Sequence, residues 1–166
     1  MKLDLDRTEH GRSELPVAGS LQLDWAEDRP RQAEVQGTLV VDNLDRRFLV
    51  NGTLQASGRA QCGRCLEEFD LSWEVPVEVM VLRDLDTDEG EGDSLVIRQT
   101  TGEVDLTEAL RESLILAFPA AAVCRPDCQG ICAQCGKDLN TGSCGCAQEE
   151  VDPRWAGLDA LDHDQD

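Results

Sequence analysis

Residues 48–81 read FLVNGTLQASGRAQCGRCLEEFDLSWEVPVEVMV, and this stretch decides the fold. In its first half, apolar or small residues take every second position from Phe48 to Cys62, with polar residues between them. The second half repeats this alternation from Phe69 to Val81. Because a period of two belongs to a strand with one buried face, the stretch predicts a long antiparallel hairpin with Cys-Gly-Arg-Cys at its tip.

Three residues within the predicted hairpin restrict its form. Gly52 and Gly58 fall in a strand that is unusually long, so we expect a bulge or bend at each glycine. Pro76 has no amide hydrogen to donate, so we expect its strand at an edge of the sheet.

The residues before the hairpin also indicate β-structure. Apolar and polar residues alternate from Leu21 to Trp25 and again from Val35 to Val41. Residues 1–82 as a whole are therefore predicted to form strands.

The residues after the hairpin predict a loop, a strand and a helix in turn. Residues 84–93 are acidic and contain glycine, which is typical of a solvated loop, and a short strand is expected at 95–98. A helix is predicted to begin at Asp105, where Glu108 completes a capping box, and to end before Pro119. Its buried stripe is expected to consist of Leu106, Leu110 and Leu114.

The composition changes in the last part of the chain. Cysteine, glycine and turn residues dominate from Cys124 to Cys146, so this segment cannot build a hydrophobic core of its own. A second short helix is expected at 153–161, with Asp152 as its N-cap and Pro153 in its first turn.

Together these patterns predict an α+β fold. We expect a mainly antiparallel β-sheet or partial barrel, one or two short helices and a Cys-rich zinc-knuckle segment. We divide the chain into a β-rich domain with a capping helix at residues 1–118, a zinc-binding segment at 119–150 that packs on the hairpin tip, and a short helix with an acidic tail at 151–166.

The charge of the chain limits its partners. Its 166 residues include 34 acidic and 15 basic side chains, which give a formal net charge of -19. Such a surface repels phosphate backbones and anionic membranes and favours a cationic protein as partner. The simpler interpretation is that the charge only keeps the chain in solution.

The sequence also predicts a compartment. No stretch reaches the roughly 18 to 20 apolar residues that cross a bilayer, and the N-terminus lacks the apolar core of a secretory signal. A cytoplasmic protein is therefore expected, in which thiols stay reduced and serve as metal ligands.

The cysteines carry the chemistry of this sequence. They form four pairs, which are Cys62 and Cys65, Cys124 and Cys128, Cys132 and Cys135, and Cys144 and Cys146. Zinc binds four thiolates in a tetrahedron, and short spacings let two ligands from one turn reach the same ion. Gly136 directly after Cys135 permits the tight turn of a zinc knuckle. We therefore predict two structural zinc ions, each held by four cysteines.

The spacing leaves three ways of combining the pairs. Their loop-closure free energies differ by only roughly 0.6 kcal/mol from one combination to the next, so entropy does not decide between them. We favour joining the first pair with the second and the third with the fourth. Joining the second with the third would place two ligand turns around one ion with only three residues between them.

Other chemistries fit the cysteines less well. A redox Cys-x-x-Cys pair normally opens a helix whose N-terminus lowers the pKa of the thiol, whereas Cys62 and Cys65 are predicted between two strands. A catalytic zinc needs an open position and usually histidine or carboxylate ligands, and the two histidines, His10 and His163, lie near the termini. An iron–sulfur cluster is the alternative metal centre. We expect a protein that is not an enzyme and has no small-molecule substrate.

Contact with RNA would have to be local. Arg64, Lys137 and Arg154 are weak candidates for partner binding near the cysteines, and ordinary surface positions are the simpler interpretation of all three.

Several blocks of residues resemble one family. Cys62-Gly-Arg64-Cys65-Leu66-Glu67 is similar to the Cys-x-Arg-Cys-Leu hairpin of the YceD family, the large ribosomal RNA subunit accumulation proteins. The resemblance continues through residues 105–106, 112–119, 124–140 and 152–154, and it covers roughly residues 55 to 161. Ala133 departs from the family pattern, which often has proline in this turn.

The resemblance implies a cytoplasmic or plastid factor that large-subunit ribosomal RNA needs in order to accumulate. The leading hypothesis is a zinc-stabilised acidic adaptor for a basic ribosomal protein or a pre-ribosomal large-subunit particle. Two alternatives stay open: a thiol-disulfide redox protein that uses Cys62 and Cys65, and a free-standing RNA-binding module.

Overall fold

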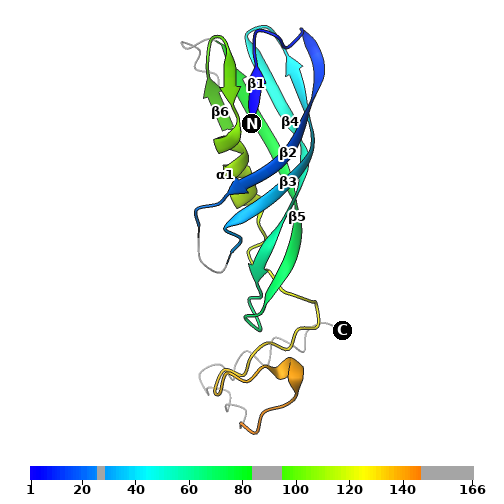
Figure 1. The fold of residues 1–166 in the computed structure, drawn as a ribbon, viewed down its shortest axis with the longest axis vertical. Coiled ribbons are helices and arrows are strands. Elements are labelled where there is room, and N and C mark those ends of the chain that lie inside the picture. The colour runs from blue at the N-terminus through cyan, green and yellow to red at the C-terminus, as the bar shows by residue number, and fades with distance from the viewer. Residues whose placement is uncertain (26–28, 84–94, 147–166) are drawn as a thin grey trace, which may run out of the picture.

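The structure is a computed structural model that describes residues 1–25, 29–83 and 95–146 (Figure 1). One sheet has the strand order β2-β3-β4-β5-β6, and β1 pairs with β7 in a second, two-stranded sheet. The strands are β1 (Lys2–Asp4), β2 (Gly11–Gln22), β3 (Gln32–Asn43), β4 (Arg47–Gln61), β5 (Glu68–Leu82), β6 (Leu95–Arg98) and β7 (Glu103–Asp105). The helical elements are α1 (Thr107–Ala117) and the 3-10 turn η1 (Leu139–Thr141).

The predicted fold class is confirmed. The described chain is mostly β-sheet with one α-helix, and the large sheet stays open instead of closing into a barrel. The expected loop at 84–93 and the expected helix at 153–161 lie outside the described residues. The division into three parts remains a prediction.

The long hairpin is confirmed as β4 and β5. The two strands pair antiparallel and without interruption, from Arg47 opposite Leu82 to Gln61 opposite Glu68. Their tip, residues 62–67, carries the first cysteine pair and lies at the end of the sheet nearest the Cys-rich segment (Figure 1).

The two hairpin glycines do not form bulges. The β4–β5 register passes Gly52 and Gly58 without an extra residue, so the prediction of a bulge at either glycine is wrong, while a bend there remains a prediction. Both positions lack room for a side chain instead. A Cβ atom at Gly52 would lie 3.0 Å from the Leu39 Cδ2 atom, and one at Gly58 would lie 2.9 Å from the Gln32 carbonyl oxygen. These glycines therefore allow close approach of neighbouring chain.

The prediction of an edge strand holds for only part of β5. β6 pairs with β5 in parallel from Val79 to Leu82 and so covers one end of its edge. Pro76 lies just before this paired part. On the side away from β4, no described strand pairs with β5 at Pro76. The missing amide hydrogen of proline therefore leaves no ladder bond unmade.

The core lies between the large sheet and α1. Phe48, Val50 and Leu54 of β4 are almost completely buried, and so are Leu110 and Leu114 of α1. The predicted leucine stripe of the helix is thus confirmed. The opposite face of the sheet carries the polar residues of the alternating pattern.

The predicted start of the helix is two residues too early. Asp105 is the last residue of β7 and pairs with Lys2 of β1, and this pairing keeps its backbone extended. Its Oδ1 atom accepts a hydrogen bond of 2.9 Å from the backbone amide of Thr107, but the N-cap residue is Leu106. The capping box between Asp105 and Glu108 is therefore wrong.

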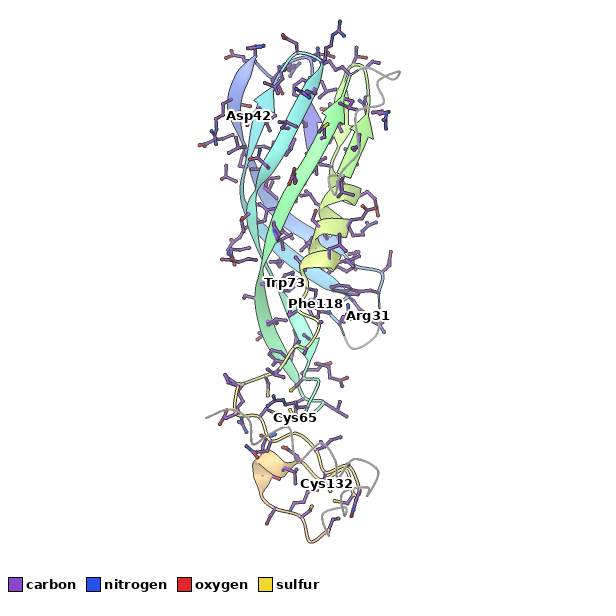
Figure 2. All side chains as sticks on the ribbon, turned by 180° about the vertical axis from the view of Figure 1, so that it is seen from behind. Arg31, Asp42, Cys65, Trp73, Phe118 and Cys132 are labelled. Atoms are coloured by element: carbon purple, nitrogen blue, oxygen red, sulfur yellow. The ribbon has the colours of Figure 1, made fainter. Side chains whose placement is uncertain are left out.

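Three aromatic rings pack together where the chain leaves the helix and turns toward the hairpin tip. Phe118, directly after α1, meets Trp25 and Trp73 edge-to-face with ring centroids 4.9 Å and 5.4 Å apart. Figure 2 shows Phe118 beside Trp73 in the lower half of the sheet, above the cysteines. This packing directs residues 119–123 along the hairpin to its tip.

Candidate functional site

The eight cysteines gather in two groups of four. The hairpin cluster consists of Cys62, Cys65, Cys124 and Cys128, and the distal cluster consists of Cys132, Cys135, Cys144 and Cys146. Within each cluster, all sulfur atoms lie within 4.8 Å of one another. This is the combination that we favoured from the spacing. Figure 2 shows the two clusters one below the other, with Cys65 at the hairpin tip and Cys132 further down.

The sulfur–sulfur distances suit a tetrahedral metal site. The Sγ atoms of Cys62 and Cys128 are 3.9 Å apart, and those of Cys65 and Cys124 are 3.7 Å apart. Four sulfurs at about 2.3 Å from a central zinc ion would be about 3.8 Å apart, whereas a disulfide needs about 2.05 Å. All eight cysteines are free thiols, so either cluster could hold a divalent ion.

The same turn presents the first pair of ligands in both clusters. In the distal cluster, Gly136 has φ +71° and its amide donates to the Cys132 carbonyl oxygen at 2.8 Å. In the hairpin cluster, Leu66 takes the matching position with φ +65°, and its amide donates to the Cys62 carbonyl oxygen at 3.0 Å. In the sequence, Gly136 predicts the turn of the distal cluster. The matching turn of the hairpin cluster could not be predicted in this way, because a leucine takes the position of the glycine.

Backbone hydrogen bonds attach the Cys-rich segment to the hairpin tip. The Gly63 amide donates to the Ala122 carbonyl oxygen at 2.8 Å, and the Ile131 amide donates to the Arg64 carbonyl oxygen at 3.0 Å. Gly130 allows this approach, because a Cβ atom there would lie 3.0 Å from the Arg64 carbonyl oxygen. The second cysteine pair is thereby held beside the first.

The environment of the hairpin cluster separates the pKa values of its thiols. Burial by itself raises the pKa of Cys62, but the backbone amides of Cys65, Cys124 and Arg64 together outweigh it and lower this pKa to about 6. Burial, together with the neighbouring sulfurs, raises the pKa of Cys124 to about 12. Four thiolates packed this closely repel one another, and a bound divalent cation would remove that repulsion.

The pKa values of the thiols are also separated in the distal cluster, although its cysteines are less buried. Backbone amides of Cys135 and Gln134 lower the pKa of Cys132 to about 6. A hydrogen bond with Cys135, followed by burial, raises the pKa of Cys146 to about 12. Cys135 is exposed, whereas three of the four cysteines of the hairpin cluster are buried. The two clusters therefore differ in how easily solvent reaches them.

The three basic residues that we considered for partner binding differ in their surroundings. The Arg64 guanidinium donates to the carbonyl oxygens of Cys128 and Pro126 at 3.0 Å and 3.3 Å. Lys137 donates to the Ser143 carbonyl oxygen at 2.7 Å, and Arg154 lies outside the described residues. Both described side chains thus hold the fold of the Cys-rich segment, and a role in partner binding remains a prediction for all three.

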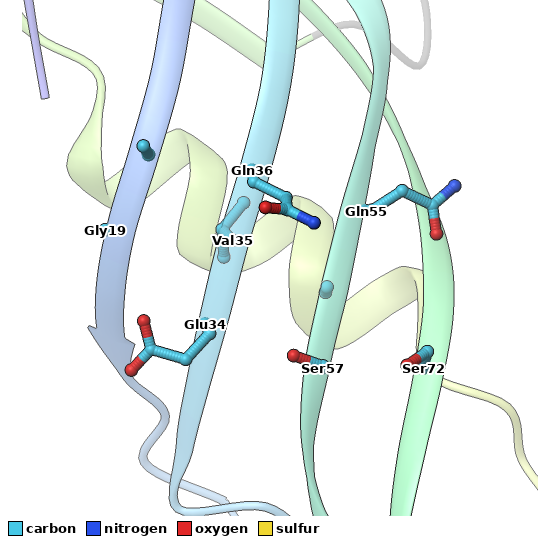
Figure 3. A pocket seen from close by; sticks show the side chains of 9 residues that line it. Gly19, Glu34, Val35, Gln36, Gln55, Ser57 and Ser72 are labelled. Carbon is cyan, nitrogen blue, oxygen red and sulfur yellow. The ribbon is translucent and has the colours of Figure 1, made fainter.

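A shallow depression of about 370 Å³ lies on the polar face of the sheet. Figure 3 shows it with α1 behind the sheet, lined by Glu34, Gln36, Gln55, Ser57 and Ser72. The described lining offers one carboxylate, two amides and two hydroxyls, which do not include an acid–base pair. We assign it no catalytic role. Within the described residues, no helix is both long enough and apolar enough to cross a membrane.

Comparisons with known proteins identify relatives of this chain. A family model described as "Large ribosomal RNA subunit accumulation protein YceD" matches residues 50–162. An uncharacterized protein of Mycobacterium tuberculosis is 36% identical over 121 residues, which cover 72% of this chain and 58% of that protein. No solved structure matches the chain.

Plant relatives carry the family name. The "Large ribosomal RNA subunit accumulation protein YCED homolog 1, chloroplastic" of Arabidopsis thaliana is 27% identical over 161 residues, covering 81% of this chain and 50% of that protein. The match thus spans only about half the length of these relatives. Since the family model covers more than half of the chain and includes every cysteine of both clusters, the chain belongs to the YceD family.

Proposed function

We propose that this chain supports the accumulation of large-subunit ribosomal RNA as a non-enzymatic, zinc-stabilised acidic adaptor. The observation that carries the proposal is the family match over residues 50–162, which contains both cysteine clusters. The names of the plant relatives state this role for those proteins, and we extend it to the present chain. We propose the cytoplasm as its compartment.

The geometry of the clusters supports zinc as the metal. Each cluster offers four thiols and no histidine or carboxylate, and soft thiolate ligands in a tetrahedron suit zinc. A site with four protein ligands has no open position for a substrate, so zinc would act there by fixing structure. In the hairpin cluster it would join the Cys-rich segment to the β-sheet.

The charge supports a basic protein as the adaptor's partner. The chain has a formal net charge of -19, and the polar face of the sheet exposes Glu34, Asp70 and Glu74. Such a face attracts the basic proteins of a large-subunit precursor and repels the phosphates of RNA. In this proposal, any contact with RNA is local and uses basic residues near the clusters.

The burial of the hairpin cluster speaks against the redox alternative. A low pKa, as at Cys62, is one property of a reactive thiol, and accessibility is the other. Cys62 is 0% exposed and its Sγ atom lies 3.9 Å from that of Cys128. This position suits a metal ligand better than a thiol that must attack a disulfide.

Depletion of the protein in its host tests the proposed function. We expect a lower ratio of large-subunit to small-subunit ribosomal RNA and a loss of large-subunit particles in sedimentation profiles. Wild-type protein should restore both, whereas a variant with Cys62→Ser and Cys65→Ser should not. Ser57→Ala on the polar face serves as a control for expression. Unchanged RNA ratios and profiles after depletion would contradict the proposal.

Metal content is measured separately. We expect two zinc ions per reduced chain, purified without chelators, and one in the variant with Cys144→Ser and Cys146→Ser. A wild-type protein without stoichiometric metal would refute the zinc sites and leave the role in RNA accumulation to the depletion experiment.

A further inference from the structure

Asn140 connects the two cysteine clusters. The residue lies in the loop between Cys135 and Cys144, which the distal cluster closes at both ends. Its side-chain Nδ2 atom donates to the Sγ atom of Cys128, a member of the hairpin cluster, over 3.5 Å. A side chain from the loop of the distal cluster thus contacts a sulfur atom of the hairpin cluster.

Neighbouring groups determine which way the Asn140 amide points. Its Oδ1 atom accepts a hydrogen bond of 2.8 Å from the backbone amide of Gln129, the residue next to Cys128. Its Nδ2 atom donates to the Asp138 carboxylate at 2.6 Å as well as to the sulfur. The oxygen is therefore directed to a donor and the nitrogen to two acceptors, which fixes the N–H group on the sulfur.

Asparagine alone among similar residues can make this set of contacts. An aspartate has the same shape and keeps the acceptor for Gln129, but it would place a second carboxylate oxygen against the Cys128 sulfur. An alanine removes both contacts. An N–H donor lowers the charge density on a thiolate and so stabilises it in a metal site, as outer-shell partners of metal ligands commonly do.

The position of Asn140 depends on the order of its loop. Within the loop, Lys137 donates to the Ser143 carbonyl oxygen at 2.7 Å, and the Leu139 amide donates to the Gly130 carbonyl oxygen at 2.8 Å. No residue of η1 is buried, so the loop has little apolar packing to hold it. The start of the loop is also tied to the preceding residues, because the Cys132 amide donates to the Lys137 carbonyl oxygen at 2.9 Å and Ile131 forms a β-bridge with Asp138. The distal cluster adds to these contacts, since a metal there would bring the two ends of the loop together.

We propose that Asn140 is a positioning residue that couples the two metal sites. Metal in the distal cluster orders the loop, the loop places the Asn140 amide on Cys128, and the hairpin cluster then binds its own metal more tightly. Because coupling between two binding sites is reciprocal, metal in the hairpin cluster strengthens the distal site by the same factor. The inference rests on the proposed metal binding.

Cobalt titration of the reduced, metal-free full chain tests the coupling, because Co²⁺ bound to four thiolates has characteristic absorption bands. Cys144→Ser with Cys146→Ser disables the distal cluster and isolates the hairpin site. With Asn140 present, this change should weaken Co²⁺ binding at the hairpin cluster by about tenfold, at the lower end of outer-shell effects. In an Asn140→Asp chain, the same change should weaken it by no more than about twofold.

Spectroscopy separates a direct contact from a general loss of structure. In the Asn140→Asp and Asn140→Ala chains, the thiolate-to-cobalt charge-transfer band of the hairpin site should move to lower energy while the tetrahedral d–d bands remain. Gln36→Glu, the same amide-to-acid change on the polar face of the sheet, should alter neither affinity nor spectrum.

The outcomes are distinguishable. An equal loss of affinity on disabling the distal cluster, with or without Asn140, would overturn the coupling through this residue. So would an unshifted charge-transfer band in both Asn140 variants. A wild-type chain that binds no cobalt would instead overturn the proposed metal sites themselves.

Discussion

At the scale of single residues, Leu66 stands out because its backbone conformation disfavours it. Its φ of +65° lies in the left-handed region, and its side chain is 51% exposed, so packing compensates little of the strain. A residue with a Cβ atom loses about 1–2 kcal/mol in this region relative to the right-handed one. The conformation is retained because the backbone amide of Leu66 must reach the Cys62 carbonyl oxygen to close the ligand turn.

Replacing Leu66 by glycine should therefore not destabilise the metal-loaded protein. Relief of strain and the added freedom of the unfolded chain nearly cancel, so we expect a change in unfolding free energy within about 1 kcal/mol, toward greater stability. Leu66→Val should lower stability, since a β-branched residue fits this region worst. Urea unfolding followed by circular dichroism measures both changes.

A matched control is Leu44→Gly. Leu44 is similarly exposed, at 44%, but its φ is not positive, so glycine there only adds freedom to the unfolded chain and should destabilise. If Leu66→Gly loses as much stability as Leu44→Gly, the left-handed turn is not strained.

At the scale of elements, close approach between β3 and β4 shapes the sheet. Their ladder is interrupted between the pairs Gln36–Gln55 and Val40–Asn51 and resumes in the same register. Gly37 lies in this gap with φ +151°, and a Cβ atom there would lie 2.8 Å from the Leu54 Cδ2 atom. Leu54 is buried and cannot move aside easily, so a glycine is needed here.

Gly37→Ala should lower the unfolding free energy by about 2 kcal/mol, through backbone strain together with overpacking against Leu54. Gly19→Ala separates the two causes, because Gly19 has a similar φ of +156° but no atom nearer than 3.8 Å to the new Cβ. Its loss should be clearly smaller in urea unfolding. Equal losses for the two variants would show that contact with Leu54 contributes nothing.

At the scale of the whole molecule, two parts are held by different forces. The sheet and α1 share one hydrophobic core that includes residues from β1 to α1. In the described Cys-rich segment, Cys128 and Gly130 are the buried residues, and Cys128 packs with the cysteines of the hairpin tip. We therefore expect the order of residues 124–146 to depend on metal in the clusters, and that of the sheet not to depend on it.

Removing metal under reducing conditions should loosen one part and spare the other. We expect a protease to cleave between residues 119 and 146 after chelation, while the strand signal in far-ultraviolet circular dichroism remains. A chain with all eight cysteines changed to serine should behave in the same way without chelator. Loss of the strand signal together with the Cys-rich segment would show instead that the metal sites hold the entire fold.

The sequence by itself determined the hairpin, the helix stripe and the cysteine pairs. These features are local. A period of two or of nearly four residues indicates which face is buried, and one to three residues between two cysteines indicate which ligands share a turn. The capping box failed because β7 pairs with β1, a contact between residues about 100 positions apart. Local patterns carry no information about such a pairing.

Only the tertiary structure decided how the cysteine pairs combine and what surrounds them. Loop-closure entropy changes so slowly with length that it left three combinations open. The hydrogen bonds of Gly63, Arg64 and Ile131 bring the second pair to the hairpin tip, and this selects one combination. The contact of Asn140 with Cys128 likewise arises only when two ligand turns lie side by side. The spacing of the cysteines determines which two ligands a single turn presents. The packing of the turns against each other determines which pairs of sulfur atoms come together.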